Sequence, residues 1–329
     1  MDVDTSHIFA IDGPETFETC CLAVFNYQYQ QNPVYHTYCK LLKKHPDNIT
    51  TSAGIPYLPI EFFKSKSVVT AKLKAKDPII FTSSGTTGST ISRHIVADIT
   101  IYERSYLKAF EHFYGPIAQY CVLALLPSYL DRQGSSLIYM ANDFIHRSHH
   151  KESGFYLNNI EALKQQLVRL DNEGTKILLL GVSFALLDFA ETYGLSLKNT
   201  IVMETGGMKG RRKEMIRSAL HQRLCEGFGV EHIHSEYGMT ELLSQAYSKG
   251  NGIFKCPPWM QVSTRDTEDP LTPQAVGKTG GLNIIDLANV HSCAFIATQD
   301  LGKTYADGSF EVLGRFDHSD VRGCNLMVI

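Results

Sequence analysis

The sequence predicts an α/β protein with a mainly parallel sheet flanked by helices, followed by a small β-rich subdomain. Short apolar runs alternate with stretches of helical periodicity from about residue 78 to about residue 228. Strands that are repeatedly followed by helices form parallel sheets with helices on both faces. After about residue 250 the helical patterns fade, and Pro, Gly and short apolar runs dominate, which indicates strands joined by turns.

The individual elements are predicted in chain order. A first helix is expected to start near Pro14, with Asp12 as its N-cap and Glu15 as the acid of a capping box. Residues 55–59 are expected to be extended, because a residue that precedes proline is excluded from the α region. The alternating part is predicted to contain strands at 78–81, 120–126, 176–180 and 200–203, and helices at 159–172, 184–193 and 211–226, the last of them stopped by Gly227.

The composition argues against several classes of protein. The 31 basic and 34 acidic side chains leave a net charge of −3, which argues against general binding to nucleic acid or to an anionic membrane. No apolar run approaches the ~18 residues of a membrane-spanning helix. The N-terminus opens with acids and lacks the features of a targeting peptide. Eight cysteines without CxxC spacing lead us to expect a cytoplasmic protein with reduced thiols.

The most informative stretch is a Ser/Thr/Gly loop that follows the predicted strand at 78–81. Backbone N–H groups and hydroxyls in such a loop can wrap a polyphosphate closely. The loop is not a Walker A motif, because no Lys-Ser/Thr pair follows Gly88. A flexible surface turn is the alternative interpretation. The residues that we expect to bind phosphate groups are Ser83, Ser84, Gly85, Thr86, Thr87 and Gly88.

This loop resembles the phosphate-binding signature of the acyl-adenylate-forming superfamily, and further segments match that superfamily in the same order. Glu204-Thr205-Gly206-Gly207 resembles the segment that lines the adenine pocket, and residues 237–241 match its YGxTE motif. Asp300 lies where the family's aspartate binds the ribose hydroxyls, and residues 314–317 resemble its GRxD hinge. The resemblance therefore implies nucleotide-binding roles for Gly206, Gly207, Tyr237, Gly238, Thr240, Asp300 and Arg315, with Glu241 as a Mg²⁺ ligand.

The resemblance also implies the reaction. A carboxylate attacks the α-phosphorus of ATP, and two like charges ~4 Å apart repel by roughly 4 kcal/mol at an effective dielectric constant of 20. Mg²⁺ on Glu241 and the donors of the loop are expected to offset this repulsion. The superfamily's usual Pro-Lys after the loop is replaced here by Thr90-Ile91. Arg93 is therefore expected to supply the catalytic cation.

One branch of the superfamily is similar over nearly the whole chain. Typical members continue after the hinge for roughly one small domain, of about a hundred residues, which forms a lid, whereas this sequence ends at Ile329. The acyl-protein synthetases of fatty acid reductase complexes, the LuxE type, are also lidless. The segments that carry this similarity are residues 55–59, 126–137, 153–157 and 322–324.

The LuxE resemblance implies an acyl-protein synthetase that takes ATP, Mg²⁺ and a carboxylic acid, favouring a fatty acid. In that family the acyl group passes from AMP to a cysteine near the C-terminus and then to a partner acyl reductase. Cys324 is the matching residue, and Arg322 is placed to lower its pKa. We expect one adenylate-forming core over 1–329, with an N-terminal segment (1–75), an α/β nucleotide-binding region (76–250) and a β-rich subdomain (251–329).

Three other functions are left open by the sequence. The first is a minimal enzyme of the acyl-CoA ligase type. The second is a non-catalytic subunit that binds nucleotide, which is disfavoured because the Mg²⁺ ligand Glu241 is kept. The third is an α/β-hydrolase that uses Ser183 with Asp286 and His291, which is disfavoured because the second glycine of the nucleophile elbow is missing.

Overall fold

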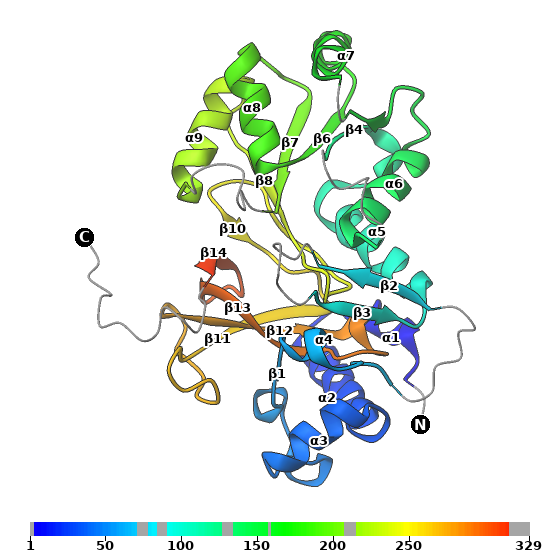
Figure 1. The fold of residues 1–329 in the computed structure, drawn as a ribbon, viewed down its shortest axis with the longest axis vertical. Helices are drawn as coiled ribbons and strands as arrows, with labels where there is room; N and C mark the ends of the chain where they lie inside the picture. Colours follow the sequence, from blue (N-terminus) through cyan, green and yellow to red (C-terminus); the bar gives the residue numbers. More distant parts are fainter. Residues whose placement is uncertain are drawn as a thin grey trace. The chain divides into compact units, whose positions relative to one another are not determined.

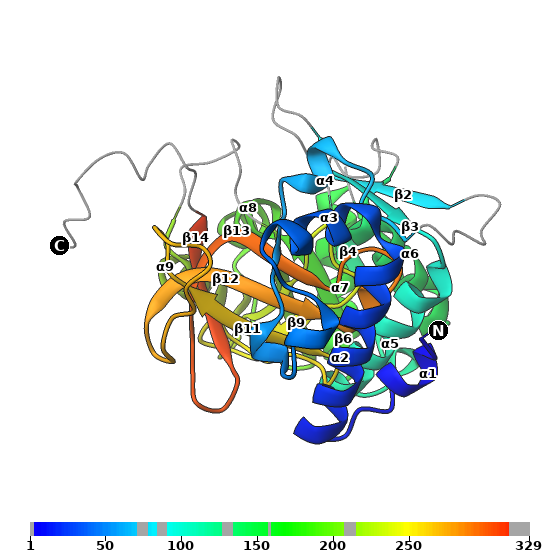
Figure 2. The ribbon, with the colours of Figure 1, turned by 90° about the horizontal axis from the view of Figure 1, so that it is seen from below.

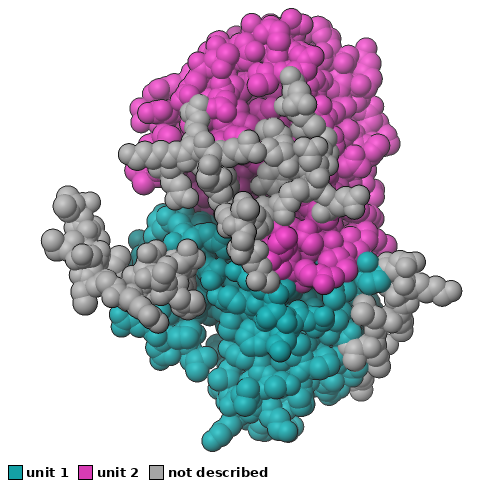
Figure 3. All heavy atoms as spheres, viewed as in Figure 1, with its two compact units in different colours: residues 1–78, 94–97, 258–329 teal, residues 79–93, 98–257 magenta. Residues whose placement is uncertain are grey.

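The computed structural model confirms the α/β class and describes residues 3–70, 78–83, 91–126, 134–156, 159–206 and 215–315 (Figure 1). The chain forms two compact units, which Figure 3 colours teal and magenta. The first unit contains residues 1–78, 94–97 and 258–329, and the second contains residues 79–93 and 98–257.

The second unit is built on a sheet with the strand order β5-β4-β6-β7-β8-β9. All neighbouring strands are parallel except β9, which is antiparallel to β8. Every residue of β4 and β6 is buried, which explains their uninterrupted apolar sequences. The strands of this sheet are β4 (Cys121–Leu125), β5 (Gly154–Phe155), β6 (Ile177–Val182), β7 (Thr200–Thr205), β8 (His234–Tyr237) and β9 (Ala246–Ser248). The same unit also contains β2 (Ile79–Thr82) and β10 (Ile253–Phe254), which are not part of this sheet.

Helices cover both faces of this sheet, as the sequence predicts. Figure 1 shows α8 and α9 on one side and α5 and α6 on the other. Asp98 caps α5 by accepting a hydrogen bond from Thr100 N at 3.0 Å, and Asn159 caps α7 in the same way from Ala162 N at 2.9 Å. The helices are α5 (Ile99–Tyr114), α6 (Ser136–Ser148), α7 (Ile160–Asn172), α8 (Ser183–Tyr193) and α9 (Arg217–Phe228), with the 3₁₀ turn η3 (Ile117–Gln119).

The predicted end of the last helix is wrong. Helix α9 continues through Gly227 and ends at Phe228, and its C-cap is Gly229, whose φ of 65° is left-handed. A Cβ at Gly227 would lie 2.5 Å from the Cβ of Ala190 on α8. Gly227 is therefore a packing residue that lets α8 and α9 approach closely. Most of the residues before Arg217 in the predicted helix lie outside the described ranges.

The first unit contains the predicted β-rich part. Strands β11 to β14 form an antiparallel series in the order β14-β13-β12-β11, and β1 pairs in parallel with β13. The strands are β1 (Leu58–Pro59), β11 (Met260–Arg265), β12 (Thr279–Asp286), β13 (Phe295–Thr304) and β14 (Phe310–Arg315). The remaining short elements are strand β3 (Arg93–Val96) and the 3₁₀ turns η1 (Pro46–Asn48), η2 (Ser52–Gly54) and η4 (Leu287–Asn289).

The N-terminal helices belong to the same unit as this sheet, and Figure 2 shows α2 and α3 beside it. Gln28 of α2 is fully buried and donates to the carbonyls of Asn289 and Val290 at 2.9 Å. Its Oε1 accepts a hydrogen bond from Ala294 N at 3.0 Å. One buried amide thus satisfies three backbone groups of the β12–β13 connection. The helices are α1 (Thr5–Ile8), α2 (Pro14–Gln31), α3 (Pro33–Leu41) and α4 (Phe62–Ser65).

The cap of α2 differs from the prediction. Gly13 is the N-cap, and Thr16 Oγ1 accepts hydrogen bonds from Gly13 N at 3.1 Å and Asp12 N at 3.2 Å. Thr16 is therefore the capping-box residue, which was predicted to be Glu15. The difference arises because the N-cap is Gly13, one residue later than the predicted N-cap Asp12. Pro14 occupies the first turn as predicted. None of the described helices combines the length and the apolar character that a membrane crossing requires.

We predict that Asp171→Ala lowers the free energy of unfolding by about 1–3 kcal/mol, because it removes a buried carboxylate that accepts several partly buried hydrogen bonds. Asp171 lies near the end of α7 and is 4% exposed. Its carboxylate accepts from Lys198 N at 2.9 Å, Asn199 N at 2.8 Å and Thr200 Oγ1 at 2.8 Å. Urea denaturation followed by circular dichroism measures the change.

The matched control for this prediction is Glu173→Ala, two residues further along the chain. Glu173 is exposed and forms an ion pair with Arg169 at 2.9 Å. Exposed pairs contribute at most about 1 kcal/mol. Equal losses in Asp171→Ala and Glu173→Ala would show that the buried carboxylate does not connect α7 to β7.

Candidate active site

The structure brings two of the predicted nucleotide segments to one edge of the sheet in the second unit. Strands β7 and β8 are parallel neighbours, and Thr205 pairs with Glu236. Gly206 and Tyr237 therefore follow at the same carboxyl edge. Open α/β sheets bind their ligands at this edge. Gly207, the other glycine of the predicted adenine segment, lies outside the described residues.

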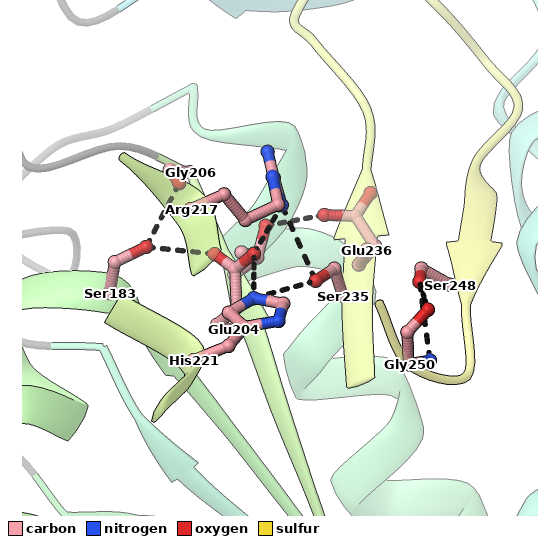
Figure 4. A network of polar contacts seen from close by, with 10 residues as sticks. Ser183, Glu204, Gly206, Arg217, His221, Ser235, Glu236, Ser248 and Gly250 are labelled. Carbon is pink, nitrogen blue, oxygen red and sulfur yellow. Dashed lines mark hydrogen bonds and ion pairs between the residues drawn. The ribbon is translucent and has the colours of Figure 1, made fainter. Parts of the chain in front are cut away.

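A buried carboxylate organises this edge (Figure 4). Glu204 of β7 is 3% exposed, and its Oε1 pairs with Arg217 Nη1 at 2.5 Å and with His221 Nε2 at 3.4 Å. Burial alone would raise the pKa of Glu204. Hydrogen bonds from His221, Ser235 and Ser183, together with the positive charge of Arg217, lower this pKa by more than burial raises it, so the net shift is downward. Glu204 is therefore held as a carboxylate.

Ser183, the first residue of α8, joins this carboxylate to the glycine segment. Its hydroxyl lies 2.8 Å from Glu204 Oε2 and 3.1 Å from the carbonyl oxygen of Gly206, and donates to both acceptors (Figure 4). Ser183 is 2% exposed. The hydrolase alternative needs a histidine at the serine hydroxyl, whereas the Ser183 hydroxyl lies against the Glu204 carboxylate and the Gly206 carbonyl. The geometry thus assigns Ser183 to holding the backbone at Gly206 and does not support the hydrolase alternative.

Glu236 is a second buried carboxyl at the same edge. It is 9% exposed and accepts a hydrogen bond from Thr205 Oγ1. Burial raises the pKa of Glu236 to about 7, with Thr205 lowering it and Glu204 raising it further. A Cβ at Gly238 would lie 2.5 Å from Glu236 Oε1. The absence of a side chain at Gly238 therefore leaves room for the Glu236 carboxyl group in this position.

The remaining motif residues follow β8 directly. The Tyr237 ring packs against Phe254 at a centroid distance of 5.8 Å, which restrains its orientation. Glu241 is 5% exposed, and Thr240 is partly exposed. A single carboxylate fits Mg²⁺ in a nucleotide site, because Mg²⁺ takes its other ligands from phosphate oxygens and water. No cluster of three or more metal-binding side chains occurs within the described ranges.

The predicted phosphate loop is described only at its ends. Ser83 N donates to Ser92 O at 3.1 Å, and Ser92 N donates to Ser83 Oγ at 3.0 Å, so the two ends of the loop are tied together. Arg93 follows directly and is exposed at the start of β3. The other predicted phosphate ligands lie outside the described residues: Ser84, Gly85, Thr86, Thr87 and Gly88. Cys324 also lies outside them.

The two predicted ribose residues meet in the first unit. Asp300 of β13 pairs with Arg315 of β14 across the antiparallel ladder, and Arg315 Nε lies 3.4 Å from Asp300 Oδ1. The Asp300 side chain is 13% exposed and that of Arg315 is 50% exposed. The motifs containing them are 15 residues apart in the chain. The strand pairing thus places a carboxylate, which accepts hydrogen bonds, beside a guanidinium, which donates them.

Several residues of this edge have no motif in the sequence. Glu204 was assigned only as part of the adenine segment, and Arg217, His221 and Glu236 were not singled out. The available signals were an acid that follows the predicted strand at 200–203 and a second acid directly before the YGxTE motif, because buried carboxylates concentrate in active sites.

Comparison with known proteins identifies one matching family and a related ligase. The family described as "Acyl-protein synthetase, LuxE" matches residues 12–329. The long-chain-fatty-acid–luciferin-component ligase of Aliivibrio fischeri is 25% identical over 335 residues, which covers 92% of this chain and 85% of that protein.

Solved structures show the fold. A 2-hydroxyisobutyryl-CoA ligase in complex with its acyl-AMP and CoA superposes with a TM-score of 0.69 at 12% identity, covering 94% of this chain and 70% of that chain. ATP-bound MatB from Rhodopseudomonas palustris superposes with a TM-score of 0.55 at 15% identity, covering 72% of this chain and 47% of that chain. The matched region thus spans about half of MatB. Since the family match extends over residues 12–329, this chain belongs to the acyl-protein synthetase (LuxE) family of adenylate-forming ligases.

Proposed function

We propose that the protein activates a long-chain fatty acid as its acyl-adenylate and passes the acyl group through Cys324 to a partner acyl reductase. Membership in the acyl-protein synthetase family supports the adenylate. The name of the Aliivibrio fischeri relative supports a fatty acid and a luciferase-system partner. The observation that carries the nucleotide site is the convergence of Gly206 and the YGxTE motif at neighbouring strand ends.

In the first half-reaction the fatty acid carboxylate attacks the α-phosphorus of ATP, forming the acyl-adenylate and releasing pyrophosphate. Ser83 and the loop after it are proposed to bind the phosphates, with Arg93 as an exposed cation beside the loop. The Tyr237 ring is proposed to stack on adenine. Mg²⁺ held by Glu241 would neutralise phosphate charge during the attack. The protein thereby reduces the repulsion between two anions and fixes the in-line geometry.

Asp300 and Arg315 are proposed to hold the ribose. A carboxylate accepts hydrogen bonds from two neighbouring hydroxyls, and such charge-assisted bonds are the strong ones. The ion pair with Arg315, with 3.4 Å between Arg315 Nε and Asp300 Oδ1, orients the Asp300 carboxylate. Half of the Arg315 side chain is exposed, which leaves it able to contact the nucleotide.

In the second half-reaction the Cys324 thiolate is proposed to attack the acyl carbonyl of the adenylate. A thioester forms and AMP leaves, so that the acyl group stays on the protein until a reductase accepts it. The described cysteines are all free thiols, which agrees with a reducing compartment such as the cytoplasm. Burial raises the pKa of Cys21, Cys39 and Cys293, which makes these thiols poor nucleophiles.

Glu241→Gln is expected to reduce ATP–pyrophosphate exchange by about 100-fold or more, because an amide lacks the anionic oxygen that Mg²⁺ requires. The exchange assay uses a panel of fatty acids at saturating Mg²⁺. The matched control is Glu231→Gln, an exposed glutamate of the same unit, which should exchange at the wild-type rate. Near wild-type exchange by Glu241→Gln would remove Glu241 from the metal site.

Cys324→Ser is expected to abolish the acyl label on the protein while leaving pyrophosphate exchange unchanged, because adenylation does not use the thiol. The measurement is a hydroxylamine-sensitive label after incubation with radiolabelled fatty acid and ATP. Cys225→Ser, which removes a partly exposed thiol among the described residues, should label normally. Full labelling of Cys324→Ser, or efficient acylation of free CoA by the wild type, would favour the minimal CoA ligase instead. An absence of exchange in the wild type would favour a non-catalytic nucleotide-binding subunit.

A further inference from the structure

Asp300 lies in an irregular part of strand β13. Gly281 of β12 pairs with Leu301, and Asn283 pairs with Ala297. A single residue of β12, Leu282, therefore faces three residues of β13, namely 298–300. This is a bulge on β13, with Asp300 as its last residue. Bulges bend a strand and re-aim its side chains, and they are frequent beside active sites.

Side chains satisfy the backbone groups within this bulge. Asp300 N donates to Thr298 Oγ1 at 3.1 Å, and the Thr298 hydroxyl donates to the carbonyl of Leu282 at 2.9 Å. Arg265 Nη1 donates to the same Leu282 carbonyl at 2.7 Å, and its Nη2 donates to the Thr298 carbonyl at 2.5 Å. The local geometry of the bulge thus depends on two side chains, one from β11 and one from β13 itself.

Arg265 reaches the bulge by crossing β12. It starts on β11, where it pairs with Gly281, and a Cβ on Gly281 would lie 2.7 Å from its Cζ. The missing side chain of Gly281 therefore opens the path for the guanidinium. On the way, Nη1 also donates to Asn283 Oδ1 at 2.9 Å. The placement of a glycine opposite an arginine is what allows one side chain to connect three strands.

The guanidinium of Arg265 is buried at a cost. The residue is 6% exposed, and burying a charge costs several kcal/mol unless its donors are satisfied. Burial lowers the pKa of Arg265, and the negative charges of Glu61 and Asp300 oppose this shift. Sheet stability alone does not require such a charge, because well-packed apolar side chains stabilise a buried position equally well.

We propose that Arg265 and Thr298 are positioning residues that set the direction of Asp300 toward the nucleotide ribose. The inference rests on the proposed assignment of Asp300 to the ribose hydroxyls. A carboxylate that accepts two hydroxyls must be held to within about 0.5 Å and 10–20°. Asp300 pairs with Arg315 of β14 but sits on a bulge where it faces β12, so on that side its direction depends on the Thr298 and Arg265 hydrogen bonds.

The test compares ATP with 2′,3′-dideoxy-ATP, which lacks both ribose hydroxyls. We expect the wild type to favour ATP in kcat/KM for pyrophosphate exchange, and Thr298→Val and Arg265→Lys each to reduce this preference by about tenfold, the size of one hydrogen bond to a charged group. The ratio of the two kcat/KM values does not depend on how much of a preparation is folded, so a loss of stability alone leaves it unchanged.

Two variants give the matched controls. Thr264→Val makes the same substitution on the same sheet, at a buried hydroxyl that lacks a hydrogen-bond partner among the described residues, and it should keep the wild-type preference. Thr298→Ser retains the hydroxyl and should restore the preference that Thr298→Val loses. Recovery by serine assigns the effect to the hydrogen bond at Asp300 N and not to packing.

Asp300→Asn separates the inference from the proposed function. If Asp300→Asn keeps the wild-type preference for ATP, the ribose assignment fails, and the inference fails with it. If Asp300→Asn loses the preference while Thr298→Val and Arg265→Lys both keep it, the ribose assignment stands and the positioning role is overturned. Loss of the preference in all three variants supports both.

Discussion

The edge of the sheet where Gly206 and Tyr237 emerge depends on one buried ionised carboxylate, that of Glu204. A charge with 3% exposure is stable only if it is paired and hydrogen-bonded. The partners come from three elements: Ser183 starts α8, Arg217 and His221 lie on α9, and Ser235 lies on β8. The requirement to satisfy this charge therefore fixes both helices against the strand end that carries the predicted adenine segment.

In the first unit, a buried side chain of the opposite charge also holds the backbone near a predicted nucleotide residue. There a buried guanidinium, that of Arg265, satisfies backbone carbonyls at a strand irregularity next to Asp300. In both units the backbone that carries a predicted nucleotide residue leaves regular sheet geometry, at Gly206 with its φ of 69° and at the β13 bulge. An irregular backbone conformation persists only when surrounding contacts hold it in place. In both units a buried charged side chain with several hydrogen bonds provides such contacts.

The fold could be predicted from the sequence more completely than the side-chain contacts at the candidate site. Apolar strands and helix periodicity are local signals, and the strands at 120–126, 176–180 and 200–203 were found for that reason. Gly227 was misread because a glycine that ends a helix and one that packs against Ala190 look alike in sequence. The pairings of Glu204 with Arg217 and of Arg265 with Thr298 join residues 13 and 33 positions apart, so no local pattern contains them. Gly281 leaves room for the guanidinium of Arg265, but the sequence does not reveal this role because it depends on the pairing of these two residues across neighbouring strands.

The two carboxyl groups at the ends of β7 and β8 differ in charge for a physical reason. Glu204 has charged and hydrogen-bonding partners that lower its pKa, whereas burial raises the pKa of Glu236 to about 7. Neighbouring carboxyls in a low dielectric do not both ionise readily. With a pKa of about 7, Glu236 is about half protonated near neutral pH, so the edge carries about half a negative charge less than two free glutamates would. This lower charge suits an edge that is proposed to receive an anionic nucleotide, because each additional carboxylate would repel the phosphates that Arg93 and the loop are proposed to attract.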